Sequence, residues 1–332
     1  MNRHDLDGLH FMRMATARTL GFALFGVGRF GEHYLRLFQH IPGVELRAVV
    51  TKGNKINPAA VFRRSDIDCI VIATPASTHF ALARAAIKAG KHVLIEKPVT
   101  ETPREAKVLI RLVKQSRRCF MVGYQLTYND YVRVLKREVG RGTFGKILLV
   151  ASTHLSMGPI RSDTGSFVDA GCHGIALARY LLGPLRVKRV RGASIAMGNK
   201  KLDDFASASI EFRNGIVMNV TTSWFFPEKV RRFVLVGSKA TAVFDDVIPS
   251  GKLKIYKRPY PFRALPRSGM SDNLARLGGI KPVVPRVRAN EPLRNELIHF
   301  IECVRKRKTP LTDVVFGAEV ADLVAAIKKE IS

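Results

Sequence analysis

The sequence predicts an α/β protein in which a doubly wound parallel sheet, shortened by one edge strand, precedes an α+β domain with a large open antiparallel sheet. In the first part of the chain, short apolar runs alternate with helical patterns, which is typical of parallel strands joined by helices. In the second part, apolar and polar residues alternate with a period of two, which is typical of antiparallel strands with one solvated face. We place the boundary after Gly123, so that residues 21–123 form the first domain and residues 124–332 the second.

Length and composition set the broad class of protein. The 332 residues are 46% hydrophobic and 25% charged, which is enough for buried cores and too apolar for a disordered chain. The four cysteines are scattered without metal-type spacing, so we predict no metal site and no disulfide scaffold, and we expect a cytoplasmic location. No run of about 18 apolar residues occurs, which excludes a transmembrane helix. Residues 1–20 lack the apolar centre of a signal peptide, and we predict a disordered extension there.

The charge is strongly basic. The chain carries 55 Lys and Arg against 27 Asp and Glu, a formal net charge of +28. This excess is compatible with a polyanionic partner such as nucleic acid, acidic lipid or a phosphorylated substrate, but we favour a solvated basic surface as its explanation. The sequence shows no helix-turn-helix, zinc or base-stacking motif, so nucleic acid is not the partner we expect. The basic, proline-rich segment 257–289 is interpreted as a long excursion, either an active-site lid or an oligomer arm.

The first strand, Phe22–Phe25, leads directly into a glycine-rich turn and then a helix. The turn reads Gly26-Val27-Gly28-Arg29-Phe30-Gly31. In the dinucleotide-binding (Rossmann) fingerprint the first glycine permits the tight turn, the second admits the diphosphate, and the third lets helix and strand pack closely. The diphosphate then rests on the helix N-terminus. Because the pattern stands between a strand and a helix, we favour cofactor binding over a purely structural turn.

The second strand, Val44–Val50, ends without the carboxylate that would bind the adenosine ribose of NAD. It is followed by Thr51 and Lys52, and the lysine suits the 2′-phosphate of NADP, although it can also be a solvated loop residue. We therefore expect NAD or NADP. Too few residues separate this strand from Asp68 for a further helix, strand and helix, since a crossover alone needs about a dozen residues. One edge strand and its helix are predicted to be missing or vestigial.

The remaining elements follow in order. Buried strands are predicted at Cys69–Ala73, His92–Ile95 and Phe120–Val122. A helix with a capping box begins at Thr102, because Pro103 and Glu105 follow it. In the second domain, Ala206–Phe212 and Ile216–Trp224 alternate around Asn214-Gly215, which predicts a hairpin. Further strands are predicted at 233–236 and 241–244, and helices at 293–304 and 316–327. An open sheet needs a cover, so we expect a homo-dimer or homo-tetramer.

Two motifs follow strands of the first domain. They are the turn Thr74-Pro75 with His79 behind it, and the tripeptide Glu96-Lys97-Pro98. In their order and spacing the sequence resembles the glucose-fructose oxidoreductase / inositol dehydrogenase (Gfo/Idh/MocA) family of NAD(P)-dependent enzymes. The resemblance implies that Lys97 is catalytic. An ammonium at the carboxyl end of a parallel strand can polarise a hydroxyl or carbonyl oxygen, which agrees; the alternative is a surface lysine paired with Glu96.

The second family signature is Asp-x-Gly-x-His, present here as Asp169-Ala170-Gly171-Cys172-His173. Spacing of four places Asp169 and His173 on one helix face, so that the carboxylate can orient an imidazole that moves the hydroxyl proton. Gly171 and Gly174 suggest that nicotinamide or substrate approaches this backbone closely. Many relatives carry another aspartate just after the histidine, and its absence here leaves one substrate contact in doubt.

The later part of the chain looks most like the bacterial nucleotide-sugar 3-dehydrogenases. The resemblance is carried by the stretches 122–124, 158–163, 242–246 and 291–293. It implies oxidation of the 3-hydroxyl of a UDP-linked N-acetyl amino sugar or its uronic acid. Arg161 is the first candidate substrate contact, with a loop ion pair as the alternative, and Tyr124 and Asn129 are candidates by position alone.

The sequence thus predicts an NAD(P)-dependent oxidoreductase acting on a small sugar substrate. The predicted catalytic residues are Lys97, Asp169 and His173, and all three are also expected to contact substrate. The predicted cofactor contacts are Gly26, Val27, Gly28, Arg29, Phe30, Gly31, Thr51, Lys52, Thr74, Pro75, His79, Glu96 and Lys97. The alternative is a non-catalytic dinucleotide- or sugar-sensing regulatory protein on the same fold, which the shortened first domain favours and the complete Lys/Asp/His set opposes.

Overall fold

The computed structural model describes residues 18–54, 56–158, 160–197, 202–257 and 281–331, and it divides the chain into two compact units. Unit 1 comprises residues 1–124 and 293–321, and unit 2 comprises residues 125–292 and 322–332. The division falls after Tyr124 and assigns residues 293–321 to unit 1, whereas the predicted second domain ran without a break from 124 to 332. Residues 1–17 of the predicted extension, and residues 258–280 of the basic segment, lie outside the described residues.

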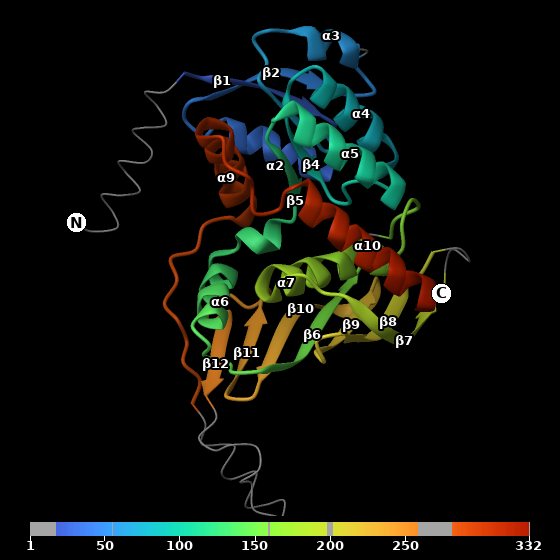
Figure 1. Ribbon diagram of the computed structural model, residues 1–332, viewed down its shortest axis with the longest axis vertical. Helices are drawn as coiled ribbons and strands as arrows, with labels where there is room; N and C mark the ends of the chain where they lie inside the picture. Colours follow the sequence, from blue (N-terminus) through green and yellow to red (C-terminus); the bar gives the residue numbers. More distant parts are fainter. Residues whose placement is uncertain (1–17, 55, 159, 198–201, 258–280, 332) are drawn as a thin grey trace, which may run out of the picture. The chain divides into compact units, whose positions relative to one another are not determined.

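Unit 1 contains a parallel sheet of five strands in the order β2-β1-β3-β4-β5 (Figure 1). The strands are β1 (Leu20–Phe25), β2 (Val44–Val50), β3 (Cys69–Ile72), β4 (His92–Glu96) and β5 (Phe120–Gly123). In the described part of the unit no strand pairs with the outer side of β2, so the prediction of a missing edge strand is confirmed. The short segment between β2 and β3 forms a six-residue helix, α3 (Pro58–Arg63).

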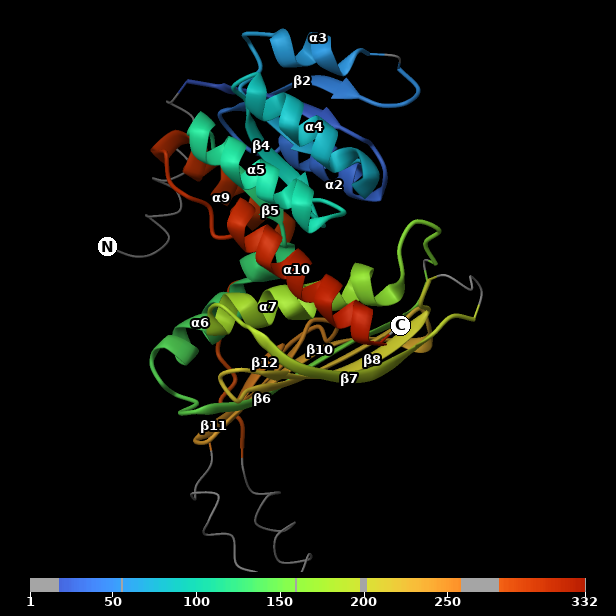
Figure 2. The same ribbon diagram turned by 45° about the vertical axis from the view of Figure 1, so that its right-hand side comes forward.

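Helices cover both faces of this sheet. They are α2 (Arg29–Phe38), α4 (Ala76–Lys88), α5 (Pro103–Ser116), α9 (Pro292–Lys306) and the start of α10 (Val314–Ile331). Adjacent residues of a strand point to opposite faces. Phe22 contacts Phe38 of α2 and Phe300 of α9, whereas Phe25 stacks on Phe62 of α3. Both views show α4 and α5 side by side (Figure 2). The predicted capping box of α5 is present: Thr102 and Glu105 exchange two side-chain-to-backbone hydrogen bonds of 3.2 and 3.3 Å.

Unit 2 contains a seven-stranded sheet in the order β12-β11-β10-β6-β9-β8-β7. The strands are β6 (Ile147–Met157), β7 (Val187–Ile195), β8 (Phe205–Phe212), β9 (Val217–Ser223), β10 (Phe225–Gly237), β11 (Ala240–Asp245) and β12 (Leu253–Lys257). The hairpin predicted around Asn214-Gly215 is confirmed as β8 and β9. The sheet is mostly antiparallel, but β6 and β9, which lie far apart in the sequence, pair in parallel. The alternating pattern of apolar and polar residues predicts the strands and does not reveal this pairing.

Two helices lie on the same side of this sheet, α6 (Asp130–Gly140) and α7 (Cys172–Leu182) (Figure 2). A short 3₁₀ turn, η1 (Gln125–Tyr128), precedes α6, and a π-helical turn, η2 (Phe167–Gly171), runs directly into α7. On the other face the side chains of Val234, Val243 and Ala151, neighbours across three strands, remain partly exposed. Among the described helices, none combines the length and apolarity needed to cross a membrane.

Candidate active site

The glycine motif of unit 1 lies between β1 and α2, and each glycine has a different environment. Gly26 has a φ of 90°, and a Cβ there would lie 2.6 Å from the carbonyl oxygen of Ala73. A Cβ on Gly31 would collide with the Gly26 carbonyl group. Gly28 is exposed, and a Cβ there would meet nothing within 4 Å. Two glycines therefore serve the chain's own packing, whereas the second leaves an open approach.

The open approach leads to the N-terminus of α2. Gly28 is its N-cap and supplies no side-chain hydrogen bond to the first turn, which contains Arg29 and Phe30. A helix N-terminus presents free N–H groups and partial positive charge, the combination that binds diphosphates. The chain around Val27 and Gly28 thus fits the diphosphate of a dinucleotide. The strands, glycines and helix stand in the order that this cofactor requires.

The loop after β2, where an adenosine ribose would be read, is held by local hydrogen bonds. The backbone N–H of Thr51 donates to Asn54 Oδ1 (3.1 Å), and the N–H of Asn54 donates to Thr51 Oγ1 (3.2 Å). Lys52 is exposed on this loop. The segment 51–57 contains no carboxylate, so the charge available to a ribose or its 2′-phosphate is positive.

The turns after β3 and β4 are joined by His79. Its ring lies 2.7 Å from the carbonyl oxygen of Pro98 through Nδ1 and 2.9 Å from that of Thr74 through Nε2. The side chain is 1% exposed, and burial lowers the pKa of His79 against the opposing effect of the two carbonyl groups. His79 therefore positions the Thr74-Pro75 turn and the Lys97-Pro98 turn from inside, which is a different role from the direct cofactor contact that we predicted.

Glu96 and Lys97 stand at the carboxyl end of β4 but have different surroundings. Glu96 is 7% exposed, and its Oε1 accepts a hydrogen bond of 3.1 Å from Tyr34 of α2. Burial raises the pKa of Glu96 to about 7, with Lys97 opposing the rise. The Lys97 residue is half-buried, at the edge of the sheet where ligands of such folds bind. The Glu96 side chain thus faces the interior of unit 1 rather than a cofactor.

In unit 2, Asp169 lies in the π-helical turn η2 and His173 in the first turn of α7. The entry to η2 is fixed by the buried carboxylate of Asp203, which accepts hydrogen bonds from Ser166 Oγ (2.9 Å) and the Phe167 N–H (2.6 Å). Between the two residues the chain changes from a π-helical to an α-helical turn, so the Asp-x-Gly-x-His motif does not lie in one regular helix as expected.

Arg161 lies in ion pairs within unit 2. Its guanidinium donates two hydrogen bonds to the carboxylate of Asp163, at 2.9 and 2.7 Å, and its Nη1 lies 3.5 Å from Asp169 Oδ1. The loop ion pair that we weighed against a substrate contact is thus present. Arg161 also forms an ion pair with Asp169, which belongs to the predicted catalytic set.

Gly171 and Gly174 were expected to allow nicotinamide or substrate to approach the backbone. In the structure, side chains of the protein itself occupy the space beside both glycines. A Cβ on Gly174 would lie 2.6 Å from the Cβ of Ser152 on β6. A Cβ on Gly171 would lie 3.2 Å from the ring of Phe167 and 3.5 Å from Val220 on β9. The glycines therefore let α7 and η2 pack closely on the sheet of unit 2, and the approaching groups belong to the protein.

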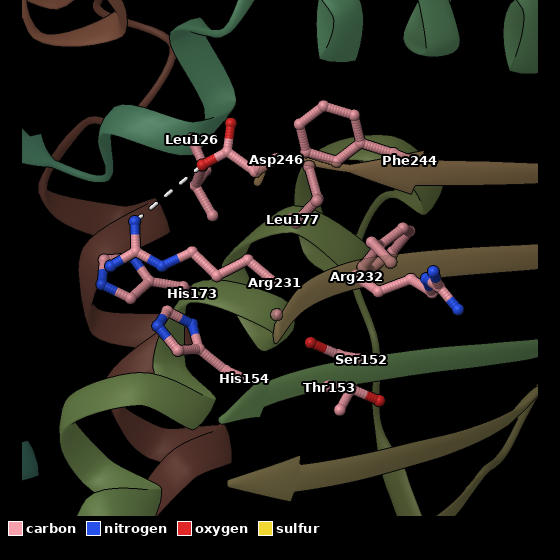
Figure 3. Close-up of a pocket in the computed structure, with 12 residues that line it drawn as sticks. Leu126, Ser152, Thr153, His154, His173, Leu177, Arg231, Arg232, Phe244 and Asp246 are labelled. Carbon is pink, nitrogen blue, oxygen red and sulfur yellow. Dashed lines mark ion pairs between the residues drawn. The ribbon is translucent and has the colours of Figure 1, made fainter. Parts of the chain in front are cut away.

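A pocket in unit 2 gathers basic side chains around His173 (Figure 3). The rings of His154 and His173 stack with their centroids 5.9 Å apart. Arg231 is the direct cross-strand neighbour of His154, and its guanidinium lies beside the two rings. Asp246 also lines the pocket, with its Oδ2 3.9 Å from Arg231 Nη1. No local pattern in the sequence points to His154, Arg231 or Asp246. Only the pairing of β6 with β10 brings the first two together.

Asp246 is the acidic member of this pocket and has several partners. Lys252 lies 3.7 Å from its Oδ1, and Asn129 donates a long hydrogen bond of 3.5 Å to the same atom. Burial raises the pKa of Asp246, and Lys252 and Arg231 oppose the rise. Within the described residues, Nε of Arg231 is buried and has no hydrogen-bond partner. Arg231 therefore brings positive charge to the pocket, together with one donor, its Nε–H, that has no partner among the described residues.

Tyr124 and Asn129, the candidates placed by position, are both buried. Tyr124 is 1% exposed and packs edge-on against Phe316, with ring centroids 5.7 Å apart. Asn129 is 6% exposed and caps α6 by accepting from the Tyr131 N–H at 2.9 Å. The structure gives them packing and capping roles, and Asn129 reaches the pocket through Asp246. No cluster of His, Cys, Asp and Glu suited to a metal ion occurs within the described ranges.

Fold and site together define an NAD(P)-dependent oxidoreductase that acts on CH–OH groups. Residues 20–124 match the family model described as the oxidoreductase family with an NAD-binding Rossmann fold, and residues 132–243 match the GFO/IDH/MocA C-terminal domain. The chain belongs to the GFO/IDH/MocA family, which confirms the resemblance seen in the sequence.

The relatives act on different polyols and sugars. The chain is 26% identical to a scyllo-inositol 2-dehydrogenase (NAD(+)) of Bacillus subtilis, over 93% of this chain and 91% of that protein. It is 27% identical to a UDP-N-acetylglucosamine 3-dehydrogenase of Acidithiobacillus ferrooxidans, over 81% of this chain and 79% of that protein. A solved structure of the latter protein has a TM-score of 0.80 at 22% identity, covering 95% of this chain and 98% of its own. A levoglucosan dehydrogenase in complex with NADH and L-sorbose has a TM-score of 0.77 at 19% identity, covering 95% and 97%. These two structures share the fold.

Proposed function

We propose that the protein oxidises a ring hydroxyl of a nucleotide-linked sugar, at the 3-position, with NAD or NADP as the oxidant. The observation that carries the proposal is the place of the two family motifs: Lys97 directly follows the carboxyl end of a parallel strand, and His173 lines a basic pocket. The relative from Acidithiobacillus ferrooxidans, named as a UDP-N-acetylglucosamine 3-dehydrogenase, supports the substrate class.

Each residue of the catalytic set has a role that its chemistry allows. His173 removes the hydroxyl proton as a general base, and Asp169 orients His173 and stabilises its charged form. Lys97 stabilises the negative charge that develops on the same oxygen. The nicotinamide, when bound, supplies the acceptor for the two electrons and the hydrogen that leave the carbon. Gly28 and the first turn of α2 would hold the diphosphate of that cofactor.

The pocket chemistry supports an anionic substrate. Arg231 lines the pocket with His154 and His173, and Lys252 lies 3.7 Å from the carboxylate of Asp246, the one acidic side chain among the lining residues. A guanidinium with a free Nε–H can donate two parallel hydrogen bonds to a phosphate or a carboxylate. The diphosphate of a nucleotide sugar, or the carboxylate of its uronic acid, would accept charge-assisted hydrogen bonds from these donors, which are stronger than those that a hydroxyl of a neutral polyol accepts.

The test is direct. The purified protein is analysed by mass spectrometry for co-purifying nicotinamide nucleotides, and absorbance of the reduced nicotinamide is then followed with UDP-sugars, free sugars and inositols. We expect bound NAD(H) or NADP(H) and turnover with a UDP-linked N-acetyl sugar or its uronic acid. Turnover with free polyols alone would overturn the substrate class. Absence of both nucleotide and turnover would favour the regulatory alternative.

We also propose that the open face of the unit 2 sheet is covered by a second copy of the chain. Val234, Val243 and Ala151 lie in one row across this face and stay partly exposed in the described chain. Contiguous exposed apolar surface of this kind usually marks an interface. Light scattering should show a dimer or tetramer for the wild type and a smaller species for Val234→Asp. A monomeric wild type, or a variant with the same mass as an oligomeric wild type, would reject the proposal that a second copy covers this face.

A further inference from the structure

Behind β4, three polar side chains meet inside unit 1. Tyr34 of α2, Glu96 of β4 and Glu296 of α9 are 0%, 7% and 0% exposed. The Tyr34 hydroxyl lies 3.1 Å from Glu96 Oε1 and 3.0 Å from Glu296 Oε1. A Cβ on Gly123 would be 3.3 Å from both carboxyl oxygens, so a glycine keeps the space into which both converge. Two carboxyl groups thus share one hydroxyl within the protein interior.

Counting hydrogen atoms shows that this cluster needs one more proton. The Tyr34 hydroxyl carries a single hydrogen, and an ionised carboxylate can only accept. If both carboxyl groups were ionised, one of the two contacts with the hydroxyl oxygen would lack a hydrogen. If one carboxyl group is protonated, it donates to the hydroxyl oxygen while Tyr34 donates to the other, and both contacts are hydrogen bonds. Two like charges in so small a buried space are also strongly disfavoured.

The surroundings distinguish the two carboxyl groups. Glu296 Oε2 is buried without a hydrogen-bond partner among the described residues, and an ionised oxygen in that position would be costly. Glu96, in contrast, accepts a hydrogen bond from the Lys97 backbone N–H and experiences the positive charge of Lys97. The proton therefore belongs to Glu296, and Glu96 is the carboxyl group whose charge can change.

We propose that Glu296 is a positioning residue that keeps one proton in this cluster, and that Glu96 changes charge beside Lys97 and thereby controls how strongly Lys97 acts on the substrate oxygen. The inference rests on the proposed function of Lys97. With Glu96 neutral, the Lys97 ammonium is directed to substrate; with Glu96 ionised, its charge is partly balanced by the neighbouring carboxylate.

The groups acting on the cluster come from three elements. Tyr34 on α2 and Lys97 after β4 stabilise ionised Glu96, and burial opposes ionisation, which places the pKa of Glu96 at about 7. Burial and then the charge of Glu96 raise the pKa of Glu296 well above its ordinary value. Burial and both carboxylates also raise the pKa of Tyr34. Glu96 is thus the member that titrates near neutral pH, in agreement with the hydrogen count.

The test compares two isosteric variants as a function of pH. In Glu96→Gln the titrating carboxyl group is removed, so the ratio of its kcat/KM to that of the wild type should change by roughly three- to tenfold between pH 6 and 8. In Glu296→Gln the amide mimics the protonated acid, so its ratio to the wild type should stay constant over the same range. Taking ratios cancels every pH effect that the enzymes share. A flat ratio for Glu96→Gln, or a pH-dependent one for Glu296→Gln, would overturn the proposal.

A second readout does not depend on catalysis. Infrared difference spectra of the full-length wild type between pH 6 and 8 should lose the carbonyl band of one protonated carboxyl group. That loss should persist in Glu296→Gln and vanish in Glu96→Gln; any other pattern contradicts the assignment of the proton. If the wild type oxidises no substrate, the proposed function fails while the infrared result still decides the proton. Should Glu296→Gln not fold, Tyr34→Phe tests the same network, because losing the shared donor should shift the pH at which the band disappears.

Discussion

In unit 1 the functional groups follow one another at the carboxyl ends of adjacent parallel strands, whereas in unit 2 the groups that surround the Asp169–His173 motif come from strands that the sequence does not place together. The glycine turn after β1, Thr74 after β3 and Lys97 after β4 all stand in short motifs. His154 and Arg231 meet because β6 pairs with β10. Short motifs therefore identify the cofactor half of such an enzyme more readily than the substrate half, where strand register decides which side chains meet.

The largest effect should come from the catalytic residue in each unit. Lys97→Ala and His173→Ala should each lower kcat by about 10²–10⁴-fold, because each removes a charge or a base from the reacting oxygen. Binding of NAD(P)H, followed by fluorescence, should change little in His173→Ala. Near-wild-type turnover in both variants would show that the motifs of the two units do not serve one reaction.

The next effect separates two glycines of the same motif. Gly26→Ala forces a Cβ to within 2.6 Å of the Ala73 carbonyl oxygen at a φ of 90°, and should lower the free energy of unfolding by about 1–3 kcal/mol. Gly28→Ala has open space and a φ of −86°, so stability should change by less than about 0.5 kcal/mol.

Cofactor binding provides the second measurement for this pair. The Kd for the dinucleotide should rise about tenfold in Gly28→Ala, because the added methyl group occupies the approach to the helix N-terminus. Unchanged binding by calorimetry would mean that the open space beside Gly28 is not where the diphosphate lies.

A smaller effect probes the register-dependent pocket of unit 2. Arg231→Gln should raise KM for a UDP-sugar by about tenfold and leave KM for an uncharged sugar unchanged, since charge-assisted hydrogen bonds are about twice as strong as neutral ones. Lys188→Gln is the matched control, because Lys188 also lies on this sheet and its side chain is 58% exposed beside Glu211. Equal effects of the two variants would indicate a general charge effect rather than a specific contact.

The most gradual effect is the dependence of stability on pH. Buried Glu96 keeps its proton up to a pKa of about 7, whereas in the unfolded chain it releases the proton near 4.5. Between these values the folded state binds the Glu96 proton more tightly, so Glu96 should make the free energy of unfolding fall as pH rises, by up to about 1.4 kcal/mol per pH unit, and this contribution should end above pH 7. Glu296 adds a fall of the same sign in both proteins, because its pKa is also raised. Urea unfolding should therefore show a smaller slope between pH 5 and 7 in Glu96→Gln than in the wild type. An identical slope in both proteins would show that Glu96 is ionised in the folded state.

Local chemistry explains what could be predicted. The glycine turn, the capping box of α5 and the hairpin at Asn214-Gly215 each depend on a few consecutive residues, and the shortness of the segment before Asp68 indicated the missing strand. The family and the class of activity followed from Glu96-Lys97-Pro98 and the Asp169–His173 motif. In each of these cases the information lies within one stretch of the chain.

Tertiary contacts explain what could not be predicted. Gly171 and Gly174 suggested an approaching ligand, but the approaching groups are Phe167, Ser152 and Val220. His79 was expected to touch the cofactor, yet it is buried between two carbonyl groups. The pairing of Glu96 with Glu296 spans most of the chain. Such neighbours are decided by packing and strand register, which no short window of sequence contains.

The C-terminal contribution to unit 1 has a practical consequence for anyone who cuts or recombines this chain. Thr312 donates to the Val122 carbonyl oxygen at 2.6 Å, and its own carbonyl oxygen accepts from the Val122 N–H at 2.7 Å, so the outer edge of β5 is closed by residues from far downstream. A fragment ending at Tyr124 would expose that edge and lose the partner of Glu96. A chimera that exchanges the nucleotide half between relatives must therefore transfer two separate pieces of chain.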